Sequence, residues 1–170
     1  MIHSIFGFFG ENAAEIIAVC ALGLTVFQAH IARTHNKLSV RPHVTHFTFR
    51  DKKPGQGILA FRLLNNGVGP AFIKSFQFFL DGELVTDPDK ALFAVLHNRN
   101  YNYSITTLGE DYAMPAGDSK DILIIVFPLK QIDCFEIIEK ELNRFDLVIE
   151  YESTYKESAR LDTRRENSER

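Results

Sequence analysis

The sequence predicts a mainly β protein, a two-sheet sandwich with two inserted helices behind one N-terminal membrane-spanning helix. Three observations predict it. Residues 13–32 form an apolar run long enough to cross a bilayer. From residue 44 onward, short alternating segments are separated by clusters of glycine, proline, asparagine and aspartate. The composition can fill a core, because 45% of the residues are hydrophobic and 15 are phenylalanine.

The apolar run AAEIIAVCALGLTVFQAHIA is predicted to be a transmembrane helix. At 1.5 Å per residue, about 20 residues cover a hydrocarbon core of roughly 30 Å. The polar residues Glu15, Gln28 and His30 lie near an end of the run, where headgroups and water reach them. A buried or partner-docked helix and a cleaved export signal are the alternatives. The segment before the run has no basic residue, which argues against an export signal.

The charges on either side of the run predict its orientation. Glu11 precedes the run without any basic residue, whereas Arg33, Lys37 and Arg41 follow it. Basic flanks stay in the cytoplasm, so we expect the N-terminus outside and the C-terminal domain on the cytoplasmic side of a bacterial inner membrane. The three cations are also predicted to contact lipid headgroups.

Small side chains recur along the predicted span at spacings of three and four residues. This period places them on one stripe of a helix, and small stripes let helices approach closely in lipid. We therefore predict helix association in the membrane, with a second copy or with the span of a partner. The stripe consists of Ala14, Ala18, Ala21, Thr25 and Ala29.

Composition divides the chain into five segments. The chain after Arg41-Pro42 is long enough for one compact core, and its last residues are too charged to bury. A net charge of −3 and a pI near 6.1 give no general attraction to nucleic acid. The segments are a short extracytoplasmic N-terminus (1–12), a transmembrane helix (13–32), a juxtamembrane stalk (33–42), a β-sandwich domain (43–162) and a disordered tail (163–170).

The domain is predicted to contain about seven strands, because apolar and polar residues alternate in short segments bounded by turns. In the third segment Phe72, Phe76, Phe78 and Leu80 are predicted to share one face. The predicted strands are 44–50, 58–64, 72–80, 101–108, 121–127, 145–152 and 155–161, and the predicted helices are 90–97 and 129–144.

Two of these strands have informative faces. Residues 121–127, DILIIVF, are apolar on both faces, which predicts a central strand. In the first strand Thr45, Phe47 and Phe49 share one face. Short strands punctuated by turns at this spacing are typical of an immunoglobulin-like β-sandwich.

Four short stretches resemble those of a known group of proteins. They are RPHV at 41–44, NNGVGPA at 65–71, PAGDS at 115–119 and YESTY at 151–155. In this order the chain resembles, from about residue 13 to residue 162, small bacterial proteins with an N-terminal membrane anchor and an immunoglobulin-like domain. The resemblance implies a fold and an anchor, and it implies no activity.

Motifs for phosphate or metal binding are weak in this chain. Gly67-Val68-Gly69 is followed by a proline and a predicted strand, with no lysine, so we interpret it as a turn rather than a phosphate loop. His43 and His46 are three apart on an extended segment, and their side chains are expected on opposite faces. We predict no metal and no cofactor.

Catalytic candidates are equally weak. Asp146, Glu150 and Glu152 alternate along one strand, which is typical of a solvated face rather than an acid–base pair. Cys134 has acidic neighbours, which disfavour its thiolate. We predict that the chain has no catalytic residues.

Three functional hypotheses follow. The leading one is a non-enzymatic, single-pass membrane protein whose β-sandwich mediates protein–protein assembly at the cytoplasmic face of the membrane. It would bind a second copy, as a homo-oligomer, or another protein, through an open sheet edge or the carboxylate face. The second is a self-assembling membrane effector, as in a bacterial defence system, whose clustered spans perturb the bilayer. The third is an enzyme with a polar pocket near Asp146 or His97.

Overall fold

The computed structural model describes residues 13–96, 101–129 and 134–164. The chain forms two compact units, the first ending at Ser39 and the second beginning at Val40. The first unit contains a helix, and the second contains two β-sheets and two short helices. Each unit is described by itself below.

Helix α2 (Ala13–Leu38) is long and apolar enough to cross a membrane. None of its residues is buried in the protein, and Ile17, Val19 and Leu22 are each about two-thirds exposed. The Thr25 hydroxyl donates to the Ala21 carbonyl oxygen, so this polar side chain satisfies its donor within the helix. The helix continues beyond residue 32, because the stalk sequence up to Leu38 contains no helix-breaking residue.

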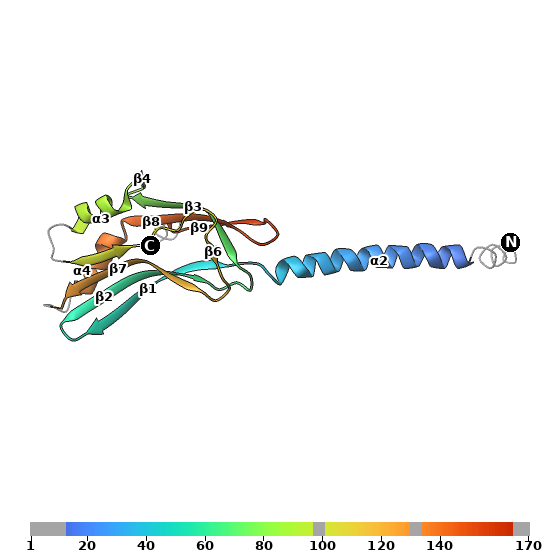
Figure 1. Cartoon of the computed structure of the whole chain (residues 1–170), viewed down its shortest axis with the longest axis horizontal. Coiled ribbons are helices and arrows are strands. Elements are labelled where there is room, and N and C mark those ends of the chain that lie inside the picture. Colours follow the sequence, from blue (N-terminus) through green and yellow to red (C-terminus); the bar gives the residue numbers. More distant parts are fainter. Residues whose placement is uncertain (1–12, 97–100, 130–133, 165–170) are drawn as a thin grey trace. The chain divides into compact units, whose positions relative to one another are not determined.

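The first sheet, sheet A, contains four antiparallel strands (Figure 1). The predicted apolar strand at 121–127 lies between two neighbours and is central, as expected. The order across the sheet is β1 (Val44–Lys53), β2 (Gln56–Asn65), β7 (Ser119–Pro128) and β5 (Asn102–Ile105).

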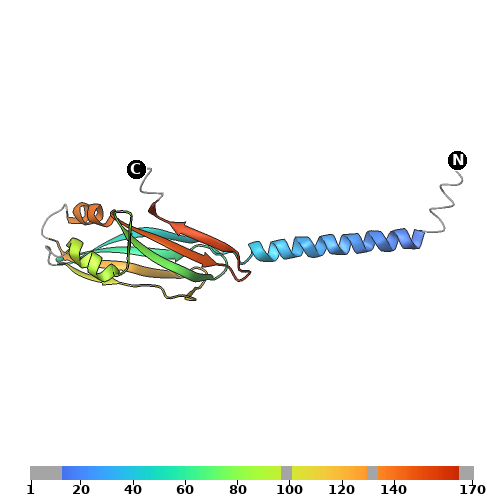
Figure 2. The ribbon, with the colours of Figure 1, turned by 90° about the horizontal axis from the view of Figure 1, so that it is seen from above.

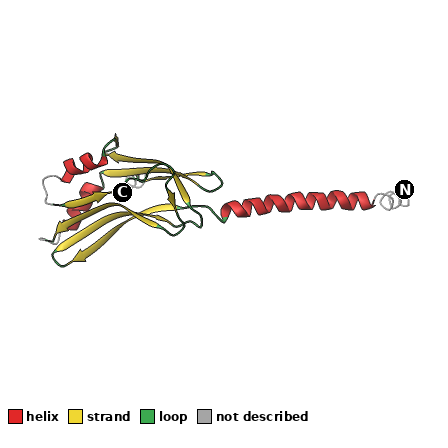
Figure 3. Cartoon of the chain, viewed as in Figure 1, coloured by secondary structure: helices red, strands yellow, loops and turns green. Residues whose placement is uncertain are grey.

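The second sheet, sheet B, contains five antiparallel strands (Figure 3). The two shortest strands of the domain were not predicted, since two or three residues are too few to show alternation. The order is β4 (Glu83–Val85), β3 (Ala71–Leu80), β8 (Phe145–Glu152) and β9 (Ser158–Asp162), and β6 (Ala113–Met114) pairs with the start of β3.

The two short helices are α3 (Pro88–Leu96) and α4 (Cys134–Leu142), and both lie at the same end of the sheets (Figure 2). Helix α3 begins where predicted, because the Asp87 carboxylate accepts a hydrogen bond from the Lys90 amide and Pro88 occupies the first helical position. Helix α4 is amphipathic, with its apolar side facing the core.

The domain has two apolar clusters that divide the inner face of sheet A. The first lies between the two sheets and includes Leu63 of β2, Ile73 of β3 and Ile149 of β8, all fully buried. The second lies between sheet A and the short helices and includes Leu92 of α3 and Ile138 of α4. One half of the sheet is therefore covered by sheet B and the other half by helices.

A bulge in β3 corrects one predicted face. The register of β3 against β8 shifts between Ile73 and Ser75, at Lys74. Because of this shift, Ile73 and Phe78 both face the core, whereas Phe72 stands opposite Glu152 on the outer face. The prediction that Phe72 shares a face with Phe76, Phe78 and Leu80 was therefore wrong for Phe72.

The turn-rich segment NNGVGPA connects β2 to β3, as predicted for a turn. A Cβ atom on Gly69 would lie 1.9 Å from the carbonyl oxygen of Val40, and one on Gly67 would lie 2.3 Å from the His43 amide nitrogen. Glycine is required here because the loop packs directly against the entering chain. The glycines are thus explained by packing, without any ligand.

The ordered domain extends slightly beyond its predicted end at residue 162. Thr163 is buried, and its hydroxyl oxygen accepts a hydrogen bond from the Leu147 amide at 2.8 Å. Thr163, which was predicted to belong to the tail, therefore packs as part of the domain. Residues 165–170, the N-terminal segment 1–12 and His97 lie outside the described residues.

A candidate interaction site at strand β1

Strand β1 has two chemically different faces. Its inner face carries His46, Thr48 and Arg50, although the inner face of a sandwich strand is usually apolar. Its outer face carries Phe47 and Phe49, which are 39% and 41% exposed. Alternation was therefore predicted correctly, but the aromatic residues lie on the solvent side of the strand.

The inner face of β1 lines a cleft of about 510 Å³. This volume is within the range of about 300–1,000 Å³ that is typical of binding sites. Phe61, which contacts both apolar clusters, lies at the cleft where the two clusters meet. Further walls include the end of α4 with the start of β8, which contribute Glu139, Asn143 and Phe145, and residues of β3 and β7.

An ion pair joins β1 to α4 at this cleft. The Arg50 guanidinium donates two hydrogen bonds to the Glu139 carboxylate. These bonds raise the pKa of Arg50 above its ordinary value, so the group is charged throughout the physiological range. The ring of His46 stacks on Phe61 with a centroid separation of 5.1 Å.

The outer face of sheet A is apolar around a single paired cation. The Arg62 guanidinium lies 5.9 Å from the ring centroid of Phe47 and 5.4 Å from that of Phe49. It also donates to the Asp121 carboxylate at 2.6 Å. Ala60 lies opposite Phe49 on this face. We call these residues and their apolar neighbours Ile58, Ile124 and Val126 the outer patch.

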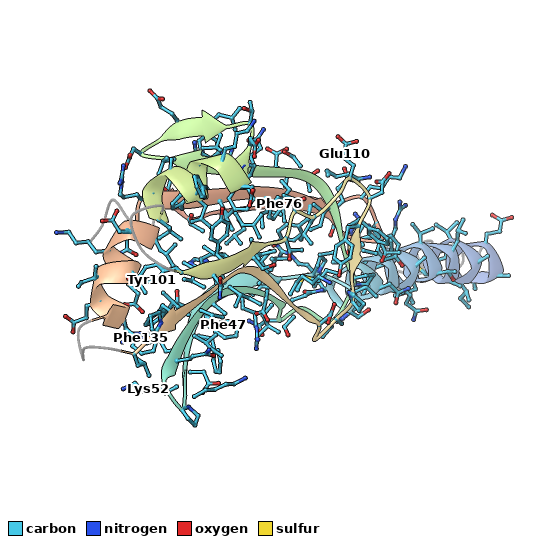
Figure 4. All side chains as sticks on the ribbon, turned by 60° about the vertical axis from the view of Figure 1, so that its left-hand side comes forward. Phe47, Lys52, Phe76, Tyr101, Glu110 and Phe135 are labelled. Atoms are coloured by element: carbon cyan, nitrogen blue, oxygen red, sulfur yellow. The ribbon has the colours of Figure 1, made fainter. Side chains whose placement is uncertain are left out.

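None of the described elements covers the outer patch, because α3 and α4 pack on the other face of sheet A. In Figure 4, Phe47 points away from the ribbon of β1, whereas Lys52 lies near Phe135 of α4. The Lys52 ammonium is 5.7 Å from the centroid of the Phe135 ring. Alternate residues of β1 thus lie on the outer patch and on the inner side of the domain.

The outer face of sheet B differs from that of sheet A, because charged residues lie on it beside Phe72 and Phe79. Glu150 stands between Ser75 and Arg160 in one row across the sheet, and Glu152 stands between Phe72 and Ser158 in another. This agrees with a solvated carboxylate face for Glu150 and Glu152. Asp146 instead accepts a hydrogen bond from the Thr163 hydroxyl at 3.0 Å, and it is not a lining residue of the cleft.

The free edge of β1 can be identified from its backbone hydrogen bonds. The His43 carbonyl accepts from the Asn66 amide, so odd-numbered residues face β2. Even-numbered residues then face away, and indeed the Val44 amide donates to the Tyr151 hydroxyl and the Lys52 amide to the Asp51 carboxylate. Within the described chain no strand pairs with this edge.

The residues predicted for helix association all lie on α2 and are exposed. They remain candidates for contacts in a membrane, since the described chain places nothing against them. Arg33 and Lys37 lie in the last turns of α2, and Arg41 lies in the second unit, where its carbonyl accepts from the Val68 amide. The exposed predicted residues are Ala14, Ala18, Ala21, Thr25 and Ala29.

The described residues contain no group of three histidine, cysteine, aspartate or glutamate side chains placed to hold a metal ion. Sequence reasoning did not identify the cleft, and the available signal was the polar series His46, Thr48 and Arg50 on alternate positions of an otherwise aromatic strand. It also missed Arg62, because its ring contacts depend on the pairing of β1 with β2.

Comparison with known proteins adds a family and no activity. No curated protein matches the chain closely enough to suggest a function. The family described as a domain of unknown function (DUF8453) matches residues 6–167, which is nearly the whole chain. This chain therefore belongs to the DUF8453 family.

Proposed function

We propose that this protein is a non-enzymatic, single-pass membrane protein whose β domain mediates protein–protein assembly at the cytoplasmic face of a bacterial inner membrane. The observation that carries the assembly role is the difference between the two outer faces of the domain. The outer face of sheet B places Glu150 beside Arg160, whereas sheet A exposes the aromatic rings of Phe47 and Phe49. Exposed apolar patches of this kind are typical of protein contact surfaces.

The membrane anchor is supported by the exposure of α2. Moving apolar surface from water into a bilayer is favourable by about 25 cal/mol for each Å² that is covered. A helix with exposed apolar side chains is therefore more stable in a bilayer than in water. Ile17, Val19, Leu22 and Leu24 are each more than 60% exposed. The basic residues Arg33, Lys37 and Arg41 at one end support an N-outside orientation.

An immunoglobulin-like topology is supported by the strand order. Sheet order β1-β2-β7-β5 corresponds to strands A-B-E-D of that fold, and β4-β3-β8-β9 corresponds to C′-C-F-G. Domains of this architecture serve many unrelated functions, so the proposed role rests on the surface and not on the fold.

The proposal is tested by changing the outer patch in the full-length protein. Phe49→Ser removes an exposed ring of the patch, and Phe93→Ser is the matched control, because Phe93 is exposed on α3 outside the patch. Each variant is expressed in its native membrane and extracted in mild detergent, and the mass and composition of the complex are measured. We expect Phe49→Ser to reduce the assembled fraction and Phe93→Ser to leave it unchanged.

Two results would contradict this proposal. A wild-type protein that is monomeric in its native membrane has no assembly to mediate. A homo-oligomer that survives Phe49→Ser but is lost on Ala18→Leu with Ala21→Leu would assign assembly to the span. That second result would instead favour the self-assembling membrane effector.

A further inference from the structure

We infer that β1 receives one extended segment of a partner protein as an added strand, with alternate side chains of that segment entering the cleft and covering Phe47 and Phe49. This inference rests on the proposed function and specifies the partner contact. It is the mode of recognition in which main-chain hydrogen bonds supply affinity and pockets for alternate side chains supply specificity.

The length and regularity of β1 distinguish it from the other edge strands. β1 has 10 residues, whereas the other strands at the ends of the two sheets, β5, β4 and β9, have 4, 3 and 5. The pairing of β1 with β2 shows no register shift along its whole length. Shortness and bulges, two of the usual protections of an edge strand, are absent from β1, and its charged residues Arg50, Lys52 and Lys53 are confined to one end.

The free edge presents its backbone groups in the middle of the strand. Its two ends are already occupied, since Val44 donates to the Tyr151 hydroxyl and Lys52 donates to the Asp51 carboxylate. Thr48 and Arg50 share the same parity, so their amides and carbonyls point toward the free edge. An incoming strand would therefore form its hydrogen bonds at these two residues.

The two faces beside this edge accommodate side chains of different kinds. A partner residue opposite Thr48 or Arg50 lies on the inner face and enters the cleft, where Phe61 and Phe145 supply apolar contacts. A partner residue opposite Phe47 or Phe49 lies on the outer face and covers exposed rings. The partner segment is thus apolar on its outer side. On its inner side it carries β-branched or aromatic residues that reach Phe61 and Phe145 beside the polar groups of the cleft.

The charges of β1 add a preference at one end. Residues 50–53 carry three cations and one carboxylate, and Arg50 is already paired with Glu139 from α4. Lys53 lies on the outer face beside Asp51, and Lys52 lies over Phe135. A partner segment with a carboxylate opposite Lys53 complements this end, and in an antiparallel arrangement that carboxylate precedes the apolar residues.

A synthetic peptide tests the inference directly. The probe is acetyl-Glu-Thr-Thr-Val-Val-Phe-Val-amide, designed to lie antiparallel to residues 47–53 with its phenylalanine opposite Thr48. Full-length protein in lipid nanodiscs is titrated with the peptide while amide hydrogen exchange is followed by NMR. We expect the Thr48 and Arg50 amides to be protected from exchange on binding.

N-methylation of the peptide separates strand addition from non-specific apolar binding. Methyl groups on the fourth and sixth residues block the amides that face β1, whereas methyl groups on the third and fifth residues face solvent. We expect the first peptide to bind about tenfold or more weakly than the unmodified one. The second should bind like the unmodified peptide. Equal weakening by both, or binding without protection of Thr48 and Arg50, would overturn the inference.

A substitution in the protein provides the complementary test in native membranes. Thr48→Pro removes an edge amide that faces away from β2, a position where a strand tolerates proline. Ser158→Pro is the matched control, since Ser158 faces the free edge of β9 by the same alternation. We expect the native complex to be lost in Thr48→Pro and kept in Ser158→Pro.

The outcomes distinguish this inference from the proposed function. A complex that survives Thr48→Pro but is lost in Phe49→Ser retains the assembly role and overturns strand addition. The Thr48 and Arg50 amides could also be protected without peptide, to an extent that rises with protein concentration. This result would show that a second copy binds this edge, and it would overturn the proposal of a different partner.

Discussion

At the scale of single residues, Asn65 holds the turn-rich segment after β2 in place. Asn65 is fully buried, and its side-chain oxygen accepts hydrogen bonds from the His43 and Gly67 amides. Its side-chain nitrogen donates to the Gly69 carbonyl at 2.8 Å and to the Met114 carbonyl at 3.1 Å. One amide side chain therefore connects the chain that enters β1, the loop after β2 and the end of β6.

We predict that Asn65→Ala lowers the free energy of unfolding by about 3–5 kcal/mol, because it leaves several buried backbone groups without partners. Asn66→Ala is the control, since Asn66 is exposed and its side-chain amide donates to the Thr45 hydroxyl. Urea unfolding of the full-length protein in detergent, followed by tyrosine fluorescence, measures both. Equal effects of the two substitutions would contradict this role.

Asp162 makes a pH-dependent contribution to the stability of the folded domain. Its carboxylate accepts hydrogen bonds from Arg164 and Arg160, and the bonds to Arg164 are the main cause that lowers its pKa to about 2. The pKa is lower in the folded protein than in the unfolded chain, so the stabilisation is complete above about pH 4 and is lost as the pH falls through about 2.

We predict that Asp162→Asn lowers the free energy of unfolding by about 1–2 kcal/mol at neutral pH. The difference from the wild-type protein should shrink as the pH is lowered from about 5 toward 2, because the wild-type carboxyl becomes protonated. Urea unfolding at a series of pH values measures the difference. A difference that stays constant with pH would indicate lost packing rather than lost charge.

At the scale of elements, helix α4 packs against sheet A through one apolar face. Ile138 is fully buried in the cluster shared with sheet A, whereas its neighbour Ile137 is 42% exposed. We predict that Ile138→Ala costs about 2–4 kcal/mol of unfolding free energy and that Ile137→Ala costs less than about 1 kcal/mol. The same urea titration compares them, and similar losses would mean that α4 does not dock as described.

Elements with strong periodicity could be predicted from the sequence. The long strands and both short helices follow from alternation, from amphipathic spacing and from a clear cap at Asp87. The face of Phe72 could not be predicted, because a single bulged residue reverses the parity that follows it. The role of Asn65 was also hidden, since a turn sequence does not reveal which of its residues is buried.

The candidate site was less predictable than the fold. The free edge of β1 and the cleft depend on which strands pair and which helix ends beside them, and these are long-range facts that local patterns do not contain. The polar inner face of β1 was visible as a pattern. The role of this face could not be inferred from the pattern, because Arg50 pairs with Glu139 on α4, which is far along the chain.

At the scale of the whole molecule, the proposed contact face can work only if the β domain lies on the same side of the membrane as its partner. The charges next to α2 are expected to determine that side. Arg33, Lys37 and Arg41 follow the apolar run, and Glu11 precedes it. On this basis alone, the positive-inside rule predicts that the β domain is cytoplasmic.

We predict that exchanging these charges inverts the protein. The variant replaces Arg33, Lys37 and Arg41 by glutamine and Glu11 and Asn12 by lysine, so that the basic flank precedes the span. With alkaline phosphatase fused to the C-terminus, which is active only outside the cytoplasm, the wild type should be inactive and about half or more of the variant molecules active. Lys156→Gln with Arg160→Gln removes charge far along the chain and should leave the fusion inactive. A wild-type fusion that is already active would reverse the orientation and place the proposed partner outside the cytoplasm.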